Sequence, residues 1–224
     1  MAHREELKFP VENRAEVSGL LLLPEKARCL MLLAHGAGAG MRHPFMESLA
    51  AELAVVQVAT LRYQFPYMEQ RRGRPDSPAI LTATVAAARQ VASQTAPNLP
   101  LFAGGKSMGG RMTSQAAAQN LLSNVRGLVF FGFPLHPPNN PGTKRADHLA
   151  KVPMPMLFLQ GTRDTLADLK LLEPIVKKFG NRATLHIIES GDHGFHVLKR
   201  SGKTDASVLA EVAQTTAVWA EKTL

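Results

Sequence analysis

Ser107 lies at the centre of a stretch of small residues that is typical of a nucleophilic serine. Residues 104–110 read Gly-Gly-Lys-Ser-Met-Gly-Gly; an apolar run precedes them, and apolar side chains at helical spacing follow over 108–122. Glycines suit a sharp strand-to-helix turn because a Cβ there would contact neighbouring backbone. The pattern predicts that the Ser107 hydroxyl stands exposed beside a helix N-terminus, which favours negative charge. The alternative is a glycine and serine turn that only starts a helix.

A serine hydroxyl becomes a nucleophile when a histidine accepts its proton and an acid orients that histidine. Asp164 follows one apolar run, and His193 stands in a glycine-flanked turn after the last apolar run. We expect Ser107, Asp164 and His193 to act as nucleophile, acid and base, in this chain order. The alternatives are Asp168 as the acid and His196 as the base.

An acyl-transfer intermediate carries an oxyanion, which two backbone N–H groups must stabilise. We expect the N–H of Met108 as one donor, because it directly follows the serine. The glycine-rich stretch 35–40 follows a buried apolar run, and Ala37 is the expected second donor. Its neighbours Gly36 and Gly38 are the alternatives. His35 precedes Ser107 in the chain, so we expect it to shape this loop by local hydrogen bonds.

The elements that position these residues alternate along the chain after a strand-rich start. Apolar runs predict strands over 17–23, 29–34, 55–63, 100–103, 125–131, 156–159 and 184–188. Apolar spacing and cap residues predict helices over 44–54, from 77, over 108–122, over 168–179 and from 205. This order predicts an α/β fold with a mostly parallel central sheet and helices on both faces. Ligands bind at the carboxyl ends of such strands, where the candidate residues lie.

Two long irregular stretches, 64–76 and 132–155, follow strands and are expected on the same side as the site. The second is too short for a full helical cap. We therefore expect a minimal lid and an open cleft, which favours a small or medium substrate over a long-chain lipid.

Four side chains in or near the first of these stretches are candidates for lining the substrate cleft. Tyr63 and Phe65 would form one wall, or would instead pack beneath the loop. Arg71 and Arg72 would form a rim that attracts a negatively charged ester, or would simply be solvated.

Composition limits the class of protein. The 224 residues are 45% hydrophobic and 20% charged, which fits one soluble α/β domain over residues 1–224. The formal net charge is +8, but the basic residues are spread along the chain, so we expect no nucleic-acid role.

Cysteine count and hydropathy address the compartment. Cys29 is the only cysteine, so no intrachain disulfide can form and no oxidising compartment is implied. The first eight residues are charged and polar, and the apolar runs are too short to span a bilayer. We expect a cytoplasmic protein without a membrane role.

His193 and His196 have a possible metal-ligand spacing but no matching third ligand, so we expect no metal and no cofactor.

Taken together, these residues resemble the α/β-hydrolase superfamily over essentially the full chain. Four segments are similar to one branch, related to dienelactone hydrolases, that includes a testis-expressed hydrolase-like protein and a subunit of a histone-acetyltransferase complex. They are 35–40, 61–67, 105–111 and 133–137. The resemblance implies a serine hydrolase of undefined substrate. A dienelactone hydrolase proper uses a cysteine nucleophile, and the presence of Ser107 argues against that specific activity.

The sequence thus predicts a serine hydrolase that cleaves a small or medium carboxylic ester or thioester through an acyl-enzyme. The alternative is a non-catalytic interaction module on the same fold, because some relatives are regarded as scaffolds. Transfer of the acyl group to an acceptor other than water stays open, as does the oligomeric state.

Overall fold

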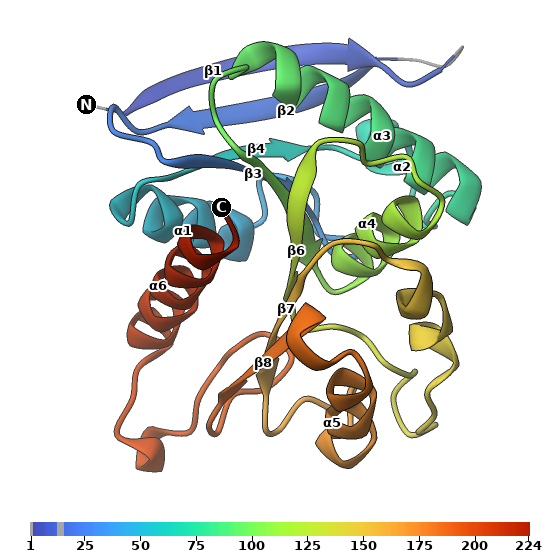
Figure 1. The fold of residues 1–224 in the computed structure, drawn as a ribbon, viewed down its shortest axis with the longest axis vertical. Helices are drawn as coiled ribbons and strands as arrows, with labels where there is room; N and C mark the ends of the chain where they lie inside the picture. The colour runs from blue at the N-terminus through green and yellow to red at the C-terminus, as the bar shows by residue number, and fades with distance from the viewer. Residues whose placement is uncertain (1, 13–15) are drawn as a thin grey trace.

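A computed structural model describes residues 2–12 and 16–224, in which eight strands form one sheet between two layers of helices (Figure 1). The strands are β1 (His3–Pro10), β2 (Glu16–Leu23), β3 (Cys29–Ala34), β4 (Val58–Tyr63), β5 (Leu101–Lys106), β6 (Val125–Phe131), β7 (Met156–Gly161) and β8 (Ala183–Ile188). Their order across the sheet is β1-β2-β4-β3-β5-β6-β7-β8. β2 pairs antiparallel with β1 and β4, and the neighbours from β4 to β8 are all parallel. The predicted fold class is confirmed.

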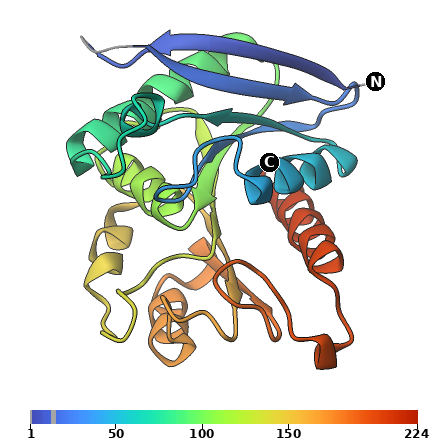
Figure 2. The same cartoon turned by 180° about the vertical axis from the view of Figure 1, so that it is seen from behind.

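Helices cover both faces of the sheet. They are α1 (Pro44–Val55), α2 (Pro66–Glu69), α3 (Pro78–Thr95), α4 (Met108–Ala118), α5 (Leu169–Lys178) and α6 (Asp205–Thr223), with short 3-10 helices η1 (Lys144–Lys151), η2 (Gly180–Arg182) and η3 (Lys199–Ser201). Figures 1 and 2 show α1 and α6 on one side of the sheet and α3, α4 and α5 on the other. Each layer buries its own apolar cluster against the sheet.

The central strands form because their residues are apolar on both sides. All six residues of β3 are buried, and so are all six of β4, as expected for parallel strands covered on two faces. β1 is different, because most of its residues are exposed and only Phe9 is fully buried. This edge strand was not predicted, since its charged residues hide the alternation that identifies a strand.

Several predicted boundaries differ from the observed ones: β5 and β7, for example, run on to Lys106 and Gly161. Two other boundaries are wrong for clear local reasons. The strand predicted from residue 55 begins at Val58, because α1 continues to Val55 and Gln57 then turns with a φ of 63°. The helix predicted over 108–122 ends at Ala118, and Asn120 follows it with a φ of 60°. Asparagine tolerates this left-handed conformation better than most residues, so it suits the end of a helix.

The long segment after β6 does not form a lid. Its 3-10 helix η1 packs against α4, where His148 Nε2 lies 2.7 Å from the Ser114 hydroxyl. None of the residues 132–155 lines the cavity at Ser107. The expected minimal lid therefore agrees with the architecture.

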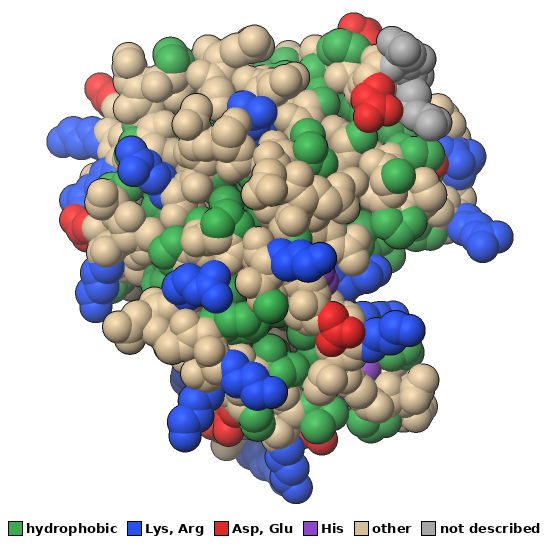
Figure 3. Space-filling model, turned by 45° about the vertical axis from the view of Figure 1, so that its right-hand side comes forward, with side chains coloured by type: hydrophobic (Ala, Val, Ile, Leu, Met, Phe, Trp, Pro, Cys, Tyr) green, Lys and Arg blue, Asp and Glu red, His purple; other side chains and the backbone are tan. Residues whose placement is uncertain are grey.

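The distribution of charge on the surface and the length of the helices are relevant to binding of nucleic acid or a membrane. In Figure 3 the Lys and Arg side chains are spread over the visible face, with hydrophobic and neutral side chains between them. Within residues 2–12 and 16–224, no helix combines the length and the apolar character needed to cross a bilayer.

Candidate active site

Ser107 stands on a strained turn between β5 and α4. Its backbone has φ 52° and ψ −118°, which a residue with a side chain rarely adopts. The turn is possible because two glycines flank the serine. A Cβ on Gly105 would lie 2.4 Å from the Ala34 carbonyl oxygen, and one on Gly109 would lie 2.5 Å from the same oxygen. The glycine spacing thus reflects close backbone packing against the end of β3.

A continuous chain of hydrogen bonds leads from this serine to a buried carboxylate. The Ser107 hydroxyl lies 2.8 Å from His193 Nε2, and His193 Nδ1 lies 2.7 Å from Asp164 Oδ2. The Asp164 side chain is fully buried, whereas the His193 side chain is 25% exposed. The structure therefore brings together the three residues that the sequence singled out, from the carboxyl ends of β5, β7 and β8.

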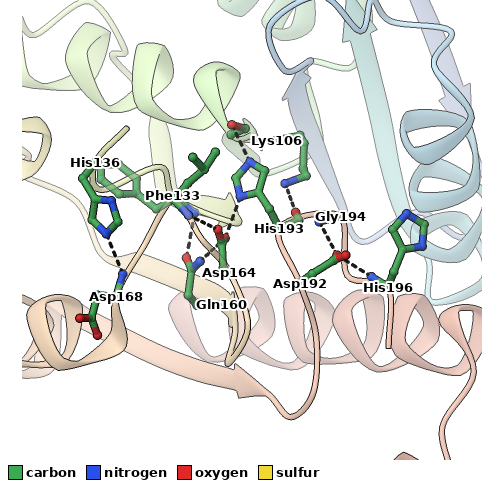
Figure 4. A network of polar contacts seen from close by, with 12 residues as sticks. Lys106, Phe133, His136, Gln160, Asp164, Asp168, Asp192, His193, Gly194 and His196 are labelled. Atoms are coloured by element: carbon green, nitrogen blue, oxygen red, sulfur yellow. Dashed lines mark hydrogen bonds and ion pairs between the residues drawn. The ribbon is translucent and has the colours of Figure 1, made fainter. Parts of the chain in front are cut away.

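Asp164 is held by more than the histidine. Gln160 Nε2 donates to Asp164 Oδ2 over 2.5 Å, and the Leu166 N–H donates to Oδ1 over 2.8 Å. The Gln160 side-chain oxygen in turn accepts the Phe133 N–H over 2.9 Å (Figure 4). With the histidine, the buried carboxylate has three hydrogen-bond partners, which fix its orientation. Sequence reasoning missed Gln160, although a glutamine at the end of an apolar strand is a recognisable signal.

The alternative acid and base lie elsewhere. Asp168 caps α5, since its side chain accepts the Lys170 N–H, and its own N–H donates to His136. His196 Nδ1 lies 2.7 Å from Asp205, and both of these side chains are more than half exposed. Neither alternative approaches the serine by hydrogen bonding, so the geometry favours Asp164 and His193.

The loop after β3 supplies backbone N–H groups near the serine. In the described part of the chain, the N–H groups of Met108, Ala37 and Gly36 donate to no loop or side-chain acceptor, so they stay candidates for the oxyanion hole. The N–H of Gly38 is engaged, because it donates to the Tyr67 hydroxyl over 3.0 Å. Gly38 is thereby removed as the second donor, while Ala37 and Gly36 both line the cavity.

His35 shapes this loop, as the sequence predicts. Its Nδ1 donates to the Gly36 carbonyl over 2.7 Å, and its Nε2 accepts the Phe65 N–H over 3.2 Å. Burial lowers the pKa of His35 to about 4, so the ring is neutral at physiological pH. One buried imidazole thus joins the loop after β3 to the loop after β4.

Comparison with known families decides the classification. A family model described as an alpha/beta hydrolase domain matches residues 27–221. This chain belongs to that family. The matched range contains every element that carries the hydrogen-bonded chain at Ser107.

Solved structures agree on the fold of this α/β hydrolase. It is similar to a dienelactone hydrolase from Anabaena variabilis, with a TM-score of 0.76 and 22% identity over 97% of this chain and 96% of that one. It is also similar to an α/β serine hydrolase without a lid from Xanthomonas campestris (TM-score 0.73, 18% identity, 97% and 94% covered). A cold-adapted esterase from an Arctic intertidal metagenomic library gives a TM-score of 0.68 at 19% identity, with 95% and 94% covered. The narrower resemblance to the testis-expressed branch stays a prediction.

A cavity of about 590 Å³ opens at the serine of this α/β hydrolase. Side chains of the loop after β3, the start of α1, the His193 loop and the start of α6 form its walls. Its lining includes Ala37, Phe45, Lys106, Leu166, Phe195 and Leu209. The wall is mainly apolar, and the charged or titratable residues in it are His43, Lys106, His193, His196 and Asp205.

The four substrate-lining candidates are not part of this wall. Tyr63 and Phe65 are fully buried and belong to the apolar cluster beneath the loop, where their rings lie 5.5 Å apart. Arg71 and Arg72 follow α2 and do not line the cavity, and Arg72 pairs with Asp76 over 2.6 Å. The lining prediction for Tyr63 and Phe65 is corrected, because their rings pack in the core. A role for Arg71 and Arg72 toward an anionic substrate stays a prediction.

Possible metal ligands and the single cysteine also bear on the chemistry of the site. In residues 2–12 and 16–224, no three His, Cys, Asp or Glu side chains are grouped so that they could hold a metal ion. Cys29 is buried at the amino end of β3, opposite the end that carries the site, and burial raises its pKa to about 11. This thiol is therefore placed and protonated unlike a nucleophile.

Proposed function

We propose that this α/β hydrolase is a serine hydrolase that cleaves a small or medium carboxylic ester or thioester through an acyl-enzyme. The observation that carries the proposal is the hydrogen-bonded chain from Ser107 Oγ through His193 to the buried Asp164. A serine, a histidine and a carboxylate in this order of contacts form the arrangement that activates a hydroxyl for acyl transfer.

Each residue has a defined part in the reaction. Ser107 Oγ attacks the substrate carbonyl carbon while His193 Nε2 takes the hydroxyl proton, and Asp164 stabilises the resulting imidazolium at Nδ1. The N–H groups of Met108 and Ala37 stabilise the oxyanion. The intermediate then expels the alcohol or thiol, which receives the proton from Nε2. Water then attacks the acyl carbon and gives a proton to His193 Nε2. The bond between the acyl carbon and Ser107 Oγ breaks, and Nε2 returns the proton to Oγ.

The cavity supports a compact acyl substrate. It opens at Ser107, its walls are mostly apolar, and residues 132–155 do not cover it. An apolar wall favours an uncharged acyl chain or ring over a strongly anionic one.

Labelling with a fluorophosphonate tests the proposal, because this probe bonds only to an activated serine. Intact mass spectrometry should find one adduct on the wild-type protein and none on Ser107→Ala. Ser123→Ala, which changes an exposed serine, is the control and should label like the wild type. A panel of esters and thioesters of increasing chain length should then give activity that Ser107→Ala lacks.

The opposite result would contradict the proposal. If the wild type forms no adduct while a known serine hydrolase labels in the same buffer, the chain is a non-catalytic member of its family. Binding experiments would then take the place of the substrate panel.

A further inference from the structure

Lys106 is a buried ammonium in a place that otherwise holds apolar groups. It is the last residue of β5 and the neighbour of Ser107, and it is 9% exposed. It lies on the same face of β5 as Phe102, which belongs to the cluster under α1 and α6. Its Nζ lies 5.7 Å from the ring centroid of Phe45 and 5.5 Å from that of Phe195. Removing an ammonium from water is costly unless strong contacts compensate for it, so this lysine calls for an explanation.

The ammonium contacts the backbone of the histidine at the site. Lys106 Nζ donates a hydrogen bond to the main-chain oxygen of His193, as Figure 4 shows. The two aromatic faces add cation–π contacts to this bond. Lys106 therefore joins the strand that carries the serine to the loop that carries the histidine.

Among the described residues, other contacts tie this loop to the segment that carries the acid and to the helices α1 and α6, but not to β5. Asp205 of α6 accepts the Val197 N–H, and the Phe195 ring stacks on Phe45 of α1. The Arg163 N–H donates to the Gly191 carbonyl over 2.8 Å, which ties the loop to the segment that carries the acid. Within the loop, the Asp192 carboxylate accepts the Gly194 and His196 N–H groups. In the described residues, only two hydrogen bonds join β5 and its turn to the loop. They are the Lys106 bond and the bond between the Ser107 hydroxyl and the His193 ring.

We propose that Lys106 is a positioning residue that holds the His193 carbonyl and thereby keeps the imidazole at the distance and angle that the serine needs. The bond between the serine and the imidazole must break and re-form as the proton moves, whereas the Lys106 bond involves no reacting atom. It therefore holds the loop through both halves of the reaction. This inference rests on the proposed serine hydrolase activity.

The charges around the ammonium fit this role. Burial lowers the pKa of Lys106 to about 8, and the carboxylates of Asp164 and Asp192 oppose that decrease. The neutral rings of Phe45 and Phe195 cover the other sides. The amine is therefore mostly charged at neutral pH, and its charge shortens and strengthens the bond to the carbonyl.

The first test replaces the ammonium with a neutral side chain of similar length. We expect Lys106→Met to fold but to lose at least about 10-fold in kcat and in the rate of fluorophosphonate labelling, because small displacements of a catalytic group have large effects. KM should stay within about twofold, since the ammonium is bonded to the His193 carbonyl, although Lys106 also lines the cavity. Lys203→Met, which removes a lysine paired with Glu211 at the surface, is the matched control and should behave like the wild type.

A chemical rescue separates the charge from the packing. Lys106→Cys can be alkylated with 2-bromoethylamine, which rebuilds a lysine-like ammonium, or with 1-iodopropane, which gives a neutral chain of the same length. The remaining cysteine, Cys29, is 3% exposed and serves as an internal site that should stay unmodified. We expect the aminoethyl adduct to recover at least about half of the wild-type labelling rate and the propyl adduct to recover almost none. Should Lys106→Met fail to fold, this comparison of two adducts decides the question.

Three outcomes would overturn the inference. They are a labelling rate of Lys106→Met within twofold of wild type, equal recovery with both adducts, and an increase in KM with kcat unchanged. The last would make Lys106 a substrate-binding residue instead. Failure of the proposed function looks different, because the wild type itself would then not label.

Discussion

At the scale of single residues, Asp164 combines complete burial with three hydrogen-bond donors. An asparagine of the same shape would keep the packing, but it would lose the negative charge that fixes the histidine tautomer and stabilises the imidazolium. We expect Asp164→Asn to reduce kcat by about 10⁴-fold, measured by steady-state hydrolysis of the best ester. The control is Asp168→Asn, which keeps a helix-capping side chain. Our assignment of the acid fails if the control loses more activity than Asp164→Asn.

Lys106 gives a second prediction at this scale, on stability. A pKa of about 8 in the folded protein, against 10.5 for a free side chain, means that the unfolded chain binds more protons between these pH values. The free energy of unfolding should therefore rise with pH across this window, by up to about 3 kcal/mol from this group. Below about pH 8 the full cost of burying the charge is present in the wild type.

Urea unfolding of the wild type and Lys106→Met from pH 7 to 10 measures this effect. We expect the variant to lack the rise, and to be at least as stable as the wild type at pH 7 while being less active. If Lys106→Met is less stable than the wild type at pH 7 and its free energy of unfolding depends on pH as the wild type's does, then Lys106 is not the group whose burial destabilises the protein.

At the scale of elements, the turn between β5 and α4 depends on glycine. A Cβ on Gly109 would lie 2.5 Å from the carbonyl oxygens of both Ala34 and His35, and neither is the end of a flexible side chain. We expect Gly109→Ala to lower the free energy of unfolding by about 3 kcal/mol and to abolish fluorophosphonate labelling. Gly73→Ala is the matched control, because nothing lies within 4 Å of its added Cβ. Thermal unfolding compares the two, and equal melting temperatures would contradict the packing argument.

The same elements show what sequence could predict and what it could not. Strands such as β3 and β6 were predicted at their observed bounds, because each is a short, mainly apolar run between turns, which is typical of a buried strand. Ser107, Asp164 and His193 could be selected because each follows a strand, and strand ends meet at one edge of a parallel sheet.

Side-chain partners from distant segments could not be read in this way. Gln160 and Lys106 are polar residues in apolar strands, and their roles depend on Asp164 and on the His193 backbone, which only the fold brings close. Tyr63 is the opposite case, a residue that the sequence placed at the site and the fold places in the core. Its position at the end of β4 suggested a cavity wall, but the alternation of side chains along the strand turns its ring into the core.

At the scale of the whole molecule, the question is whether the chain unfolds as one unit. The family match covers 27–221, so β1 and β2 lie outside it, yet β2 pairs with β4, which the match includes. β1 in turn pairs with β2 along its full length. We propose that residues 1–224 form a single domain in which this antiparallel pair is a cooperative part of the sheet.

Trp219 makes this testable, because it is the only tryptophan and lies far along the chain from β1. Trp219 is part of α6, and its ring packs against Phe102 of β5 with the ring centroids 5.8 Å apart. Its fluorescence therefore reports on the centre of the sheet. We expect urea unfolding followed by this fluorescence and by far-ultraviolet circular dichroism to give one shared midpoint. Circular dichroism that changes at lower urea than fluorescence would mean that β1 and β2 unfold separately. Hydrogen exchange over 3–10 and 16–23 would then identify them, since a separate pair would lose protection before the parallel strands do.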